Sequence, residues 1–192
     1  NVDIESADGA AVHARASVPH ITDSWRQYSV TLRTGRVVPS PADRFVISAA
    51  GLGTVYLNQV SLFPPTYHNR VNGTRPDIMR LLDGMKPAFL RFPGGNYLEG
   101  DHITELYEWK KTIGSLVDRP THPSPWNYHS SDGLGLLEFF EWCEDLHMQP
   151  LLAVYAGYSM RQEHVDAGPA LEPYVQDALD EIEYATGSTS TK

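Results

Sequence analysis

The sequence predicts an α/β protein whose N-terminal part is rich in β-structure. Short runs of alternating apolar and polar residues, separated by proline and glycine, occupy the first part of the chain. After residue 64, helical patterns and short apolar runs alternate along the chain. Strands separated by helices are typical of a parallel sheet with crossover helices. We therefore expect two regions, a β-rich region over residues 1–64 and an α/β region over residues 65–192.

Three runs in the N-terminal region have the pattern of short strands. Prolines and glycines lie between them, as turn residues do. Several short strands with turns between them predict a β-sandwich or jelly roll. The three predicted strands are Trp25–Thr34, Arg44–Ala49 and Thr54–Phe63.

The second region begins with a predicted helix and a strand. Thr74 is the expected N-cap, and Pro76 lies in the first turn, where proline is tolerated. Apolar residues then recur at helical spacing up to Met85. The apolar run Pro87–Phe92 follows and predicts the first strand of this region.

A second helix and strand and a third helix follow in order. The helix over Gly133–His147 has Asp132 as its expected cap and Cys143 on its apolar face. The continuous apolar run Pro150–Tyr155 predicts a strand covered on both faces. The last helix begins near Pro169, and Gly187 is placed to end it. The two strands are therefore expected to be parallel.

The segment between the two strands is the expected functional region. Arg91–Gly100 ends a strand in Pro-Gly-Gly and then presents polar side chains, and ligands bind at the carboxyl edge of parallel strands. A tight turn is the alternative. Pro93–Asp132 is long for a loop, which is typical of functional loops. Its aromatic and polar groups suit sugar rings and hydroxyls, although aromatic residues also anchor loops. These groups are Asn96, Tyr97, Glu99, Glu105, Tyr107, Trp109, Lys110, Arg119, Trp126, Tyr128 and His129.

Composition and missing motifs exclude several other classes of function. A net charge of -9 argues against binding to nucleic acid. No segment has the length of a membrane span, and Asn1–Glu5 is no signal peptide, so the chain is cytoplasmic or its signal has been removed. There is no phosphate-binding loop, dinucleotide fingerprint or nucleophile elbow, and the histidines lack ligand spacing. We therefore expect no cofactor and no metal.

Motifs along most of the chain resemble glycoside hydrolase family 51, the α-L-arabinofuranosidases, in its secreted fungal and plant-like branch. The motifs agree in order and spacing. They include Phe63-Pro64-Pro65-Thr66-Tyr67, Asn69-Arg70, Arg91-Phe92-Pro93-Gly94-Gly95-Asn96, Trp109-Lys110, Arg119-Pro120, Glu141-Trp142-Cys143 and Leu152-Ala153-Val154-Tyr155.

The resemblance implies part of a (β/α)8 TIM barrel, preceded by the end of a β-sandwich or jelly-roll domain. Enzymes of this kind retain stereochemistry with two carboxylates. The family's acid/base is a glutamate preceded by asparagine, but this sequence contains no Asn-Glu pair. No catalytic residue is therefore assigned to this chain. We expect a second polypeptide segment, beyond a cut near Gly187–Lys192 or missing from the chain, to complete the barrel and supply the catalytic glutamates.

The resemblance also implies substrate-binding residues. Asn96 matches the asparagine that hydrogen-bonds arabinofuranose, and Gly95 belongs to the same motif. Trp109 matches an aromatic position that walls the sugar pocket. Glu99 orients its neighbours or binds sugar, or alternatively forms a salt bridge within the loop.

Two functions follow from these observations. The chain is part of an enzyme that removes terminal α-L-arabinofuranosyl residues from arabinoxylan or arabinan, or it is a non-catalytic carbohydrate-binding module. Asn72-Gly73-Thr74 is an N-glycosylation sequon, although Thr74 alternatively serves only as the helix cap. With the family's secreted branch, the sequon favours an extracellular location.

Overall fold

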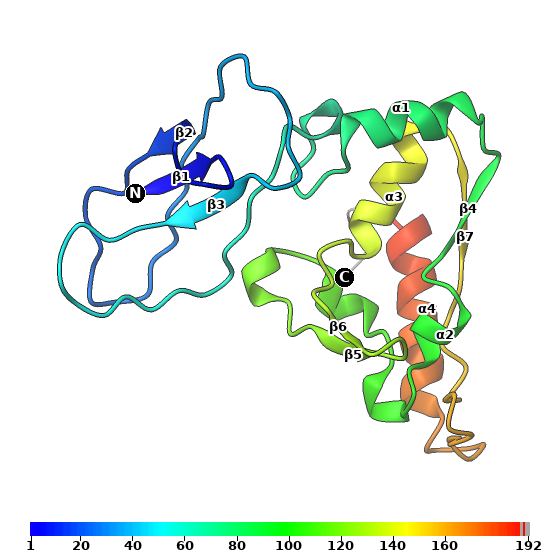
Figure 1. Cartoon of the computed structure of the whole chain (residues 1–192). Coiled ribbons are helices and arrows are strands. Elements are labelled where there is room, and N and C mark those ends of the chain that lie inside the picture. The colour runs from blue at the N-terminus through cyan, green and yellow to red at the C-terminus, as the bar shows by residue number, and fades with distance from the viewer. Residues whose placement is uncertain (189, 191–192) are drawn as a thin grey trace. The chain divides into compact units, whose positions relative to one another are not determined.

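The computed structural model describes residues 1–188 and residue 190 (Figure 1). The chain forms two compact units: the first is Asn1–Asn58, and the second begins at Gln59. The sequence places the boundary slightly later, after residue 64. The predicted carbohydrate-binding and catalytic identities of the two regions stay predictions.

The first region contains one antiparallel sheet of three short strands. They are β1 (Val2–Glu5), β2 (Val12–Ala16) and β3 (Arg44–Ile47), in the order β2-β1-β3. The predicted strand Arg44–Ala49 is confirmed as β3. A single three-stranded sheet is not yet a sandwich, so the jelly roll stays a prediction.

Two predicted strands of the first region are wrong. Trp25–Thr34 and Thr54–Phe63 contain no regular secondary structure. Their apolar side chains are exposed rather than packed on one face: Trp25 is 74% exposed and Tyr56 is 78% exposed. Alternation predicts a strand only when a partner strand and a buried face exist. Strands β1 and β2, for which the sequence yields no prediction, do have partners: β1 pairs with both β2 and β3.

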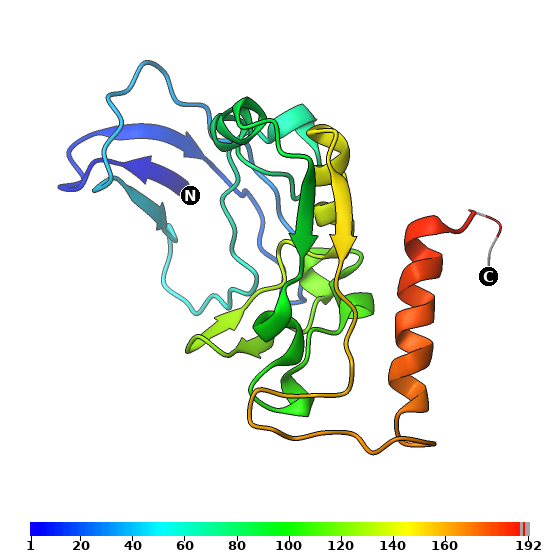
Figure 2. The ribbon, with the colours of Figure 1, turned by 90° about the vertical axis from the view of Figure 1, so that its right-hand side faces the viewer.

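The second region has the predicted order of helices and parallel strands. Strands β4 (Phe89–Phe92) and β7 (Gln149–Leu152) run side by side in the same direction, with Phe89 opposite Gln149 (Figure 2). Helix α3 lies between them in sequence and provides the crossover. The helices are α1 (Pro76–Gly84), α2 (Gly95–Glu99), α3 (Leu136–Asp145) and α4 (Glu172–Thr186). Gly187 ends α4 as predicted.

Short elements occupy the long segment between β4 and α3. The hairpin of β5 (His122–Ser124) and β6 (Tyr128–Ser130) is antiparallel, and three 3-10 turns precede it. The turns are Ile103–Glu105, Trp109–Thr112 and Leu116–Asp118, and a fourth, Tyr67–Asn69, precedes α1.

Two predicted helix caps are wrong. Helix α1 begins after Arg75 rather than Thr74, and no side chain caps it. Helix α3 begins after Gly135, whose N–H donates to Glu138 Oε2 at 2.8 Å. This bond satisfies the free N–H group at the helix start. The Asp132 carboxylate is engaged elsewhere, in a network of loop side chains.

The core of the second region joins the strands, α3 and the long loop. Phe92 stacks on Phe139 with ring centroids 4.7 Å apart. Cys143 is buried as predicted, and burial raises the pKa of its thiol. Ten buried hydrophobic residues form one cluster: Met79, Phe92, Leu98, Tyr107, Trp109, Leu136, Cys143, Leu146, Met148 and Tyr155. None of the helices in the described part of the chain has the length and apolar character needed to cross a membrane.

Candidate functional site

The Pro-Gly-Gly-Asn stretch bends sharply at the end of β4. Gly94 precedes α2 with φ 94°, and Gly100 follows it with φ 70°. A Cβ atom on Gly100 would lie 2.6 Å from the Glu105 carbonyl oxygen. Positive φ and this close approach both require glycine. The bend therefore holds a short helix at the carboxyl end of the strand, where the sequence predicts a ligand-binding edge.

Three of the four predicted substrate-binding residues lie together on α2: Gly95, Asn96 and Glu99. Asn96 is exposed, and its side-chain amide has no hydrogen bond to any described residue. Glu99 is partly buried and forms no ion pair with a described residue, so the predicted alternative of a loop salt bridge is not observed. The Arg91 guanidinium approaches Gly95 from the strand: a Cβ on Gly95 would lie 3.7 Å from Arg91 Nη2.

The structure places Trp109, the fourth predicted residue, in the hydrophobic core. Trp109 is 5% exposed, and its indole N–H donates to the Asp177 carbonyl at 3.2 Å. Its ring lies 5.5 Å from the Tyr184 ring of α4. Trp109 therefore anchors the long loop to α4, and its contact with substrate stays a prediction.

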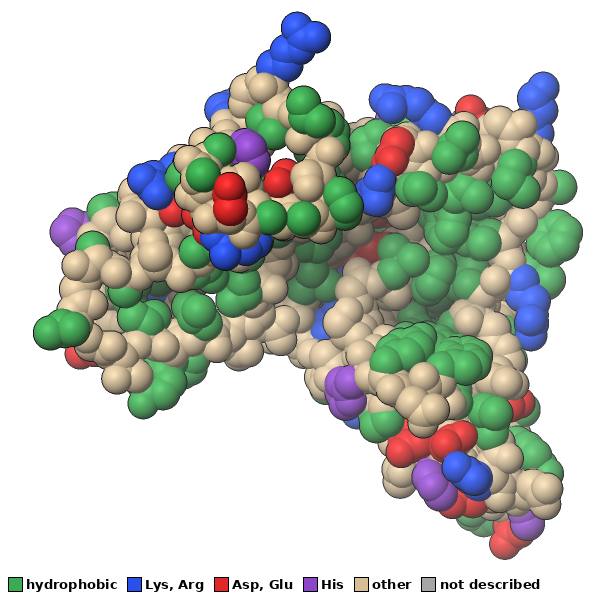
Figure 3. All heavy atoms as spheres, viewed as in Figure 1, with side chains coloured by type: hydrophobic (Ala, Val, Ile, Leu, Met, Phe, Trp, Pro, Cys, Tyr) green, Lys and Arg blue, Asp and Glu red, His purple; other side chains and the backbone are tan. Residues whose placement is uncertain are grey.

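An open hollow of about 370 Å³ lies beside α2. Its wall combines the end of the strand, the β5–β6 hairpin and the start of α3. Figure 3 shows hydrophobic side chains gathered around a hollowed face of the second region. The lining residues are Pro93, Tyr97, Trp126, Tyr128, Ser130, Ser131, Asp132, Gly133, Leu134 and Phe139.

Three nearly parallel rings in this wall form what we call the aromatic shelf: Tyr97, Trp126 and Tyr128. The Tyr97 and Trp126 planes differ by 13°, with centroids 6.4 Å apart. The Trp126 and Tyr128 planes differ by 15°, with centroids 6.5 Å apart. Trp126 is 52% exposed and Tyr128 is 54% exposed, so these faces are open to a ligand. Flat apolar faces of this kind suit sugar rings.

Sequence reasoning placed the shelf residues among many loop candidates without selecting them. The available signal was local: Trp126-Asn127-Tyr128 is a turn that carries two large aromatic rings. Only the hairpin geometry shows that both rings stay exposed while Trp109 becomes buried.

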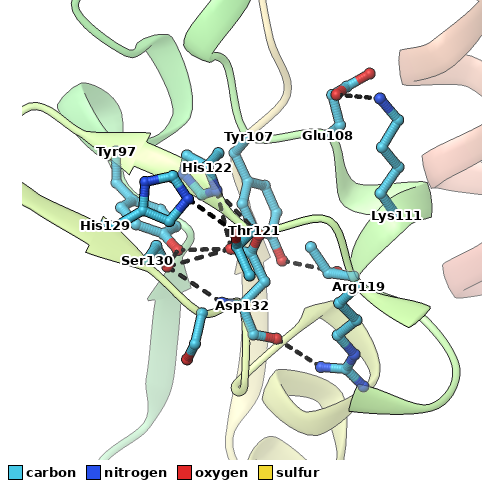
Figure 4. A network of polar contacts seen from close by, with 12 residues as sticks. Tyr97, Tyr107, Glu108, Lys111, Arg119, Thr121, His122, His129, Ser130 and Asp132 are labelled. Atoms are coloured by element: carbon cyan, nitrogen blue, oxygen red, sulfur yellow. Dashed lines mark hydrogen bonds and ion pairs between the residues drawn. The ribbon is translucent and has the colours of Figure 1, made fainter. Parts of the chain in front are cut away.

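A polar network lies behind the shelf and centres on Asp132 (Figure 4). The Tyr97 hydroxyl donates to Asp132 Oδ1 at 3.1 Å and shares a 2.6 Å hydrogen bond with Ser130 Oγ. His122 Nδ1 lies 3.0 Å from Asp132 Oδ2. Burial raises the pKa of Tyr97 far above its ordinary value, so its hydroxyl keeps its proton.

A buried ion pair connects this network to α3. Arg119 Nη2 donates to Glu138 Oε1 at 2.7 Å, and both side chains are at most 5% exposed. Burial alone raises the pKa of Glu138, but hydrogen bonds from Arg119, Asn72 and the Gly135 N–H outweigh it and the pKa is lowered. Glu138 is therefore ionised at neutral pH. Among the described residues, no group of three His, Cys, Asp or Glu side chains is arranged to hold a metal ion.

A parallel strand pair, a polar bend at its carboxyl end and an open aromatic shelf thus lie together in the second region. The family comparison specifies the class. The model described as "Alpha-L-arabinofuranosidase 1 domain" matches residues 81–192. The chain belongs to this family, the α-L-arabinofuranosidases of glycoside hydrolase family 51, as its motifs predict.

Curated relatives agree with this assignment. Alpha-L-arabinofuranosidase A of Aspergillus kawachii is 40% identical over 189 residues, which are 93% of this chain and 30% of the relative. The Aspergillus niger enzyme of the same name is 44% identical over 75% of this chain and 23% of its own length. Alpha-L-arabinofuranosidase 1 of Arabidopsis thaliana is 36% identical over 79% of this chain and 22% of its own length. The chain thus spans less than a third of these relatives.

A solved structure of an arabinofuranosidase can be aligned over the whole chain. The arabinose-bound MgGH51 α-L-arabinofuranosidase aligns with a TM-score of 0.85 and 34% identity, covering 100% of this chain and 31% of that chain. The fold of the chain is therefore that of one part of a larger arabinofuranosidase.

Proposed function

We propose that this chain supplies part of the sugar-binding edge of a retaining α-L-arabinofuranosidase. The enzyme removes terminal α-L-arabinofuranosyl residues from arabinoxylan or arabinan. The observation that carries the proposal is the open aromatic shelf beside the strand-end bend that presents Asn96. The family membership and the arabinose bound to the MgGH51 relative support an arabinofuranosyl group as the sugar that is bound.

Each predicted binding residue has a distinct part in this proposal. The free amide of Asn96 donates to and accepts from sugar hydroxyls. Gly95 lies beside the Arg91 guanidinium in the same bend, and Glu99 offers a carboxylate with no competing ion pair among the described residues. Trp109 walls the pocket from behind by holding the long loop against α4.

The catalytic glutamates lie outside this chain in our proposal. Retaining enzymes need two carboxylates about 5 Å apart, and the sequence has no Asn-Glu pair for the acid/base position. A second polypeptide segment completes the (β/α)8 barrel from β4 and β7, and the first region forms the end of a jelly roll. No nucleic acid or membrane takes part.

We also propose that the protein is extracellular and glycosylated at Asn72. The resemblance to the family's secreted branch and the sequon Asn72-Gly73-Thr74 favour this location. Asn72 Nδ2 donates to Glu138 Oε1 at 3.2 Å, and a glycosylated amide keeps one N–H for this bond. Intact mass of protein from a glycosylating host tests the site, and an unmodified Asn72 would refute it.

Binding of an α-L-arabinofuranosyl oligosaccharide tests the central proposal. We expect Trp126→Ala to weaken binding by about tenfold, because an aromatic stacking contact contributes on the order of 1 kcal/mol or more. Asn96→Ala should weaken it by a similar factor. Trp25→Ala is the matched control, since Trp25 is 74% exposed but lies in the first region. Equal binding by all three variants would refute the proposal.

Turnover separates the enzyme from the carbohydrate-binding module. This chain alone should bind the sugar without hydrolysing it, and hydrolysis should appear once the segment with the Asn-Glu pair is present. Turnover by the 192-residue chain alone would show that a catalytic pair lies within it. No turnover after the complete barrel is assembled would favour the module.

A further inference from the structure

We infer that Asp132 is the positioning residue of the aromatic shelf: its carboxylate sets the Tyr97 ring and the β5–β6 hairpin in the geometry that binds sugar. The inference rests on the proposed function. It holds that the affinity for sugar depends on the Asp132 carboxylate, which lies behind the aromatic shelf. Asp132 lines the hollow but is only 5% exposed, so it acts chiefly through its neighbours.

The first contact of Asp132 fixes the Tyr97 ring. Tyr97 comes from α2, next to Asn96, whereas Asp132 precedes α3 in the chain. The 3.1 Å bond between the Tyr97 hydroxyl and Asp132 Oδ1 joins these two elements. A phenol bonded at its oxygen to a buried carboxylate loses freedom to tilt. The first ring of the shelf therefore keeps one orientation.

The second set of contacts fixes the hairpin that carries the other two rings. Ser130 Oγ lies 3.2 Å from Asp132 Oδ1 and accepts the Asp132 N–H at 3.3 Å, while its own proton serves the 2.6 Å bond to the Tyr97 hydroxyl. His122 Nδ1 lies 3.0 Å from Oδ2. Since Ser130 and His122 are paired residues of β6 and β5, one carboxylate holds both strands. Trp126 and Tyr128 lie between these two anchored ends.

The third contact ties Asp132 to the rigid part of the molecule. Arg119 Nη1 donates to the Asp132 carbonyl oxygen at 2.6 Å while its guanidinium pairs with Glu138 on α3. Arg119 also donates to the Gly114 carbonyl at 2.8 Å. The backbone of Asp132 is thus fixed by the core. Its carboxylate in turn holds Tyr97 and the β5–β6 hairpin in place. Figure 4 shows these contacts converging on Asp132.

Three variants of the chain test the inference by their affinity for arabinotriose. Asp132→Asn removes the charge but keeps the size, and we expect the Kd to rise about tenfold, because hydrogen bonds to a charged group are the strong ones. Tyr97→Phe keeps the ring and removes the hydroxyl contacts with Asp132 and Ser130, with an expected loss of about threefold. The double variant should lose less than the product of the two factors, because Asp132→Asn weakens a contact that Tyr97→Phe removes.

Asp145→Asn is the control for simple loss of stability. Asp145 is a carboxylate of equal burial, 5% exposed, but it pairs with Arg70 and His68 away from the hollow. We expect it to lower the melting temperature and leave the Kd unchanged. If Asp132→Asn fails to fold, Tyr97→Phe alone carries the test. Wild-type affinity in both Asp132→Asn and Tyr97→Phe would overturn the inference.

The fluorescence of Trp126 provides a readout that needs no sugar. The difference in emission between each protein and its Trp126→Phe counterpart isolates this residue from the other three tryptophans. We expect Asp132→Asn to shift this emission and Asp145→Asn to leave it unchanged. Unchanged emission in Asp132→Asn would overturn the inference. Absence of arabinotriose binding by the wild type, with the emission shift present, would refute the proposed function and retain the positioning role.

Discussion

The two regions of the chain are stabilised in different ways. In the first region, Asp3 and Ala14 are the buried residues, and backbone pairing holds three short strands together. In the second region, ten buried hydrophobic residues form one cluster that joins strands, helices and the long loop. The polar groups differ in the same way: Arg15 of the first region is 55% exposed, whereas Arg119 of the second is 1% exposed.

This difference explains where a binding site can be built. A ligand-binding geometry needs side chains whose positions are fixed by their neighbours. The shelf and the α2 bend are attached to the core through Asp132, Arg119 and Trp109. Equivalent substitutions in the two regions should therefore have unequal effects, and the following pairs test this expectation from the largest effect to the smallest.

Removal of the buried cation should have the largest effect. Arg119→Met leaves the Glu138 carboxylate buried without its partner, and we expect the free energy of unfolding of the second region to fall by about 3–5 kcal/mol. Arg15→Met is the matched change in the first region, where Asp3 is buried but Arg15 is 55% exposed, so water can replace the guanidinium and the loss should be smaller. Urea denaturation followed by tryptophan fluorescence measures both. Equal losses would contradict the comparison.

The pH dependence of the same pair has a defined sign. The pKa of Glu138 is lowered from its ordinary 4.5 in the folded wild type, so the stability it contributes is present above 4.5 and is lost as pH falls through the lowered pKa. Arg119→Met removes the largest of the interactions that lower the pKa of Glu138, so this pKa rises relative to the wild type and protonation in acid costs the variant less stability. The stability gap between wild type and variant should therefore narrow in acid, and a constant gap would contradict this account.

Truncation of a core leucine should have the next largest effect. Leu136 is fully buried, and Leu136→Ala should lower the free energy of unfolding by about 2–5 kcal/mol through lost contacts and a cavity. Leu52 of the first region is fully exposed, and Leu52→Ala should change it by less than about 0.5 kcal/mol. Thermal unfolding of both variants checks this pair, and a comparable loss in Leu52→Ala would show that the first region has a core of its own.

A single methyl group should distinguish the two regions at glycine positions. A Cβ on Gly135 would lie 2.2 Å from the Thr112 carbonyl oxygen, so Gly135→Ala must shift the start of α3, at a cost of about 1–3 kcal/mol. A Cβ on Gly51 meets nothing within 4 Å, so Gly51→Ala should be neutral or slightly stabilising. Melting temperatures compare them, and an unchanged Gly135→Ala would mean that this contact is loose.

The smallest expected effect concerns two loops at the carboxyl ends of β4 and β7. His102 Nδ1 lies 2.7 Å from Glu163 Oε1, and this bond raises the pKa of His102 and lowers the pKa of Glu163. The ordinary pKa values are 4.5 for glutamate and 6.5 for histidine, and between these pH values the pair contributes its full stability to the loop contact. The contribution is lost as pH rises through the raised pKa of His102.

Amide hydrogen exchange measures this loop contact. The Met160 N–H donates to the Gly100 carbonyl and the Arg161 N–H to the Asp101 carbonyl, so both report the joined loops. The ratio of exchange rates in His102→Gln and wild type should exceed one between pH 4.5 and 6.5 and approach one at alkaline pH. A ratio that does not change with pH would exclude the ion pair as the cause.

Local patterns predicted the second region better than the first, for a physical reason. The apolar runs that became β4 and β7 pair with each other, and Phe92 of β4 lies in the core, so the pattern and the pairing agree. The prediction that the second strand is covered on both faces is wrong, because Leu151 of β7 is 51% exposed. In the first region, the runs at Trp25–Thr34 and Thr54–Phe63 alternate without a partner strand or a buried face. The two predicted helix caps are wrong for a similar reason. Thr74 and Asp132 have side chains that suit an N-cap, but Arg75 and Gly135 occupy the N-cap positions.

Some features of the candidate site could likewise be predicted from local sequence, and others could not. Local sequence patterns were enough to predict the order of helices and parallel strands, the family, and the strand-end bend with Asn96, because glycine, proline and apolar spacing act over a few residues. Long-range packing was needed to bury Trp109 while leaving Trp126 exposed, and to join α2 to the hairpin through Asp132. These outcomes depend on contacts between residues 33 to 68 positions apart, such as Tyr97 with Ser130 and Trp109 with Asp177, which local patterns do not encode.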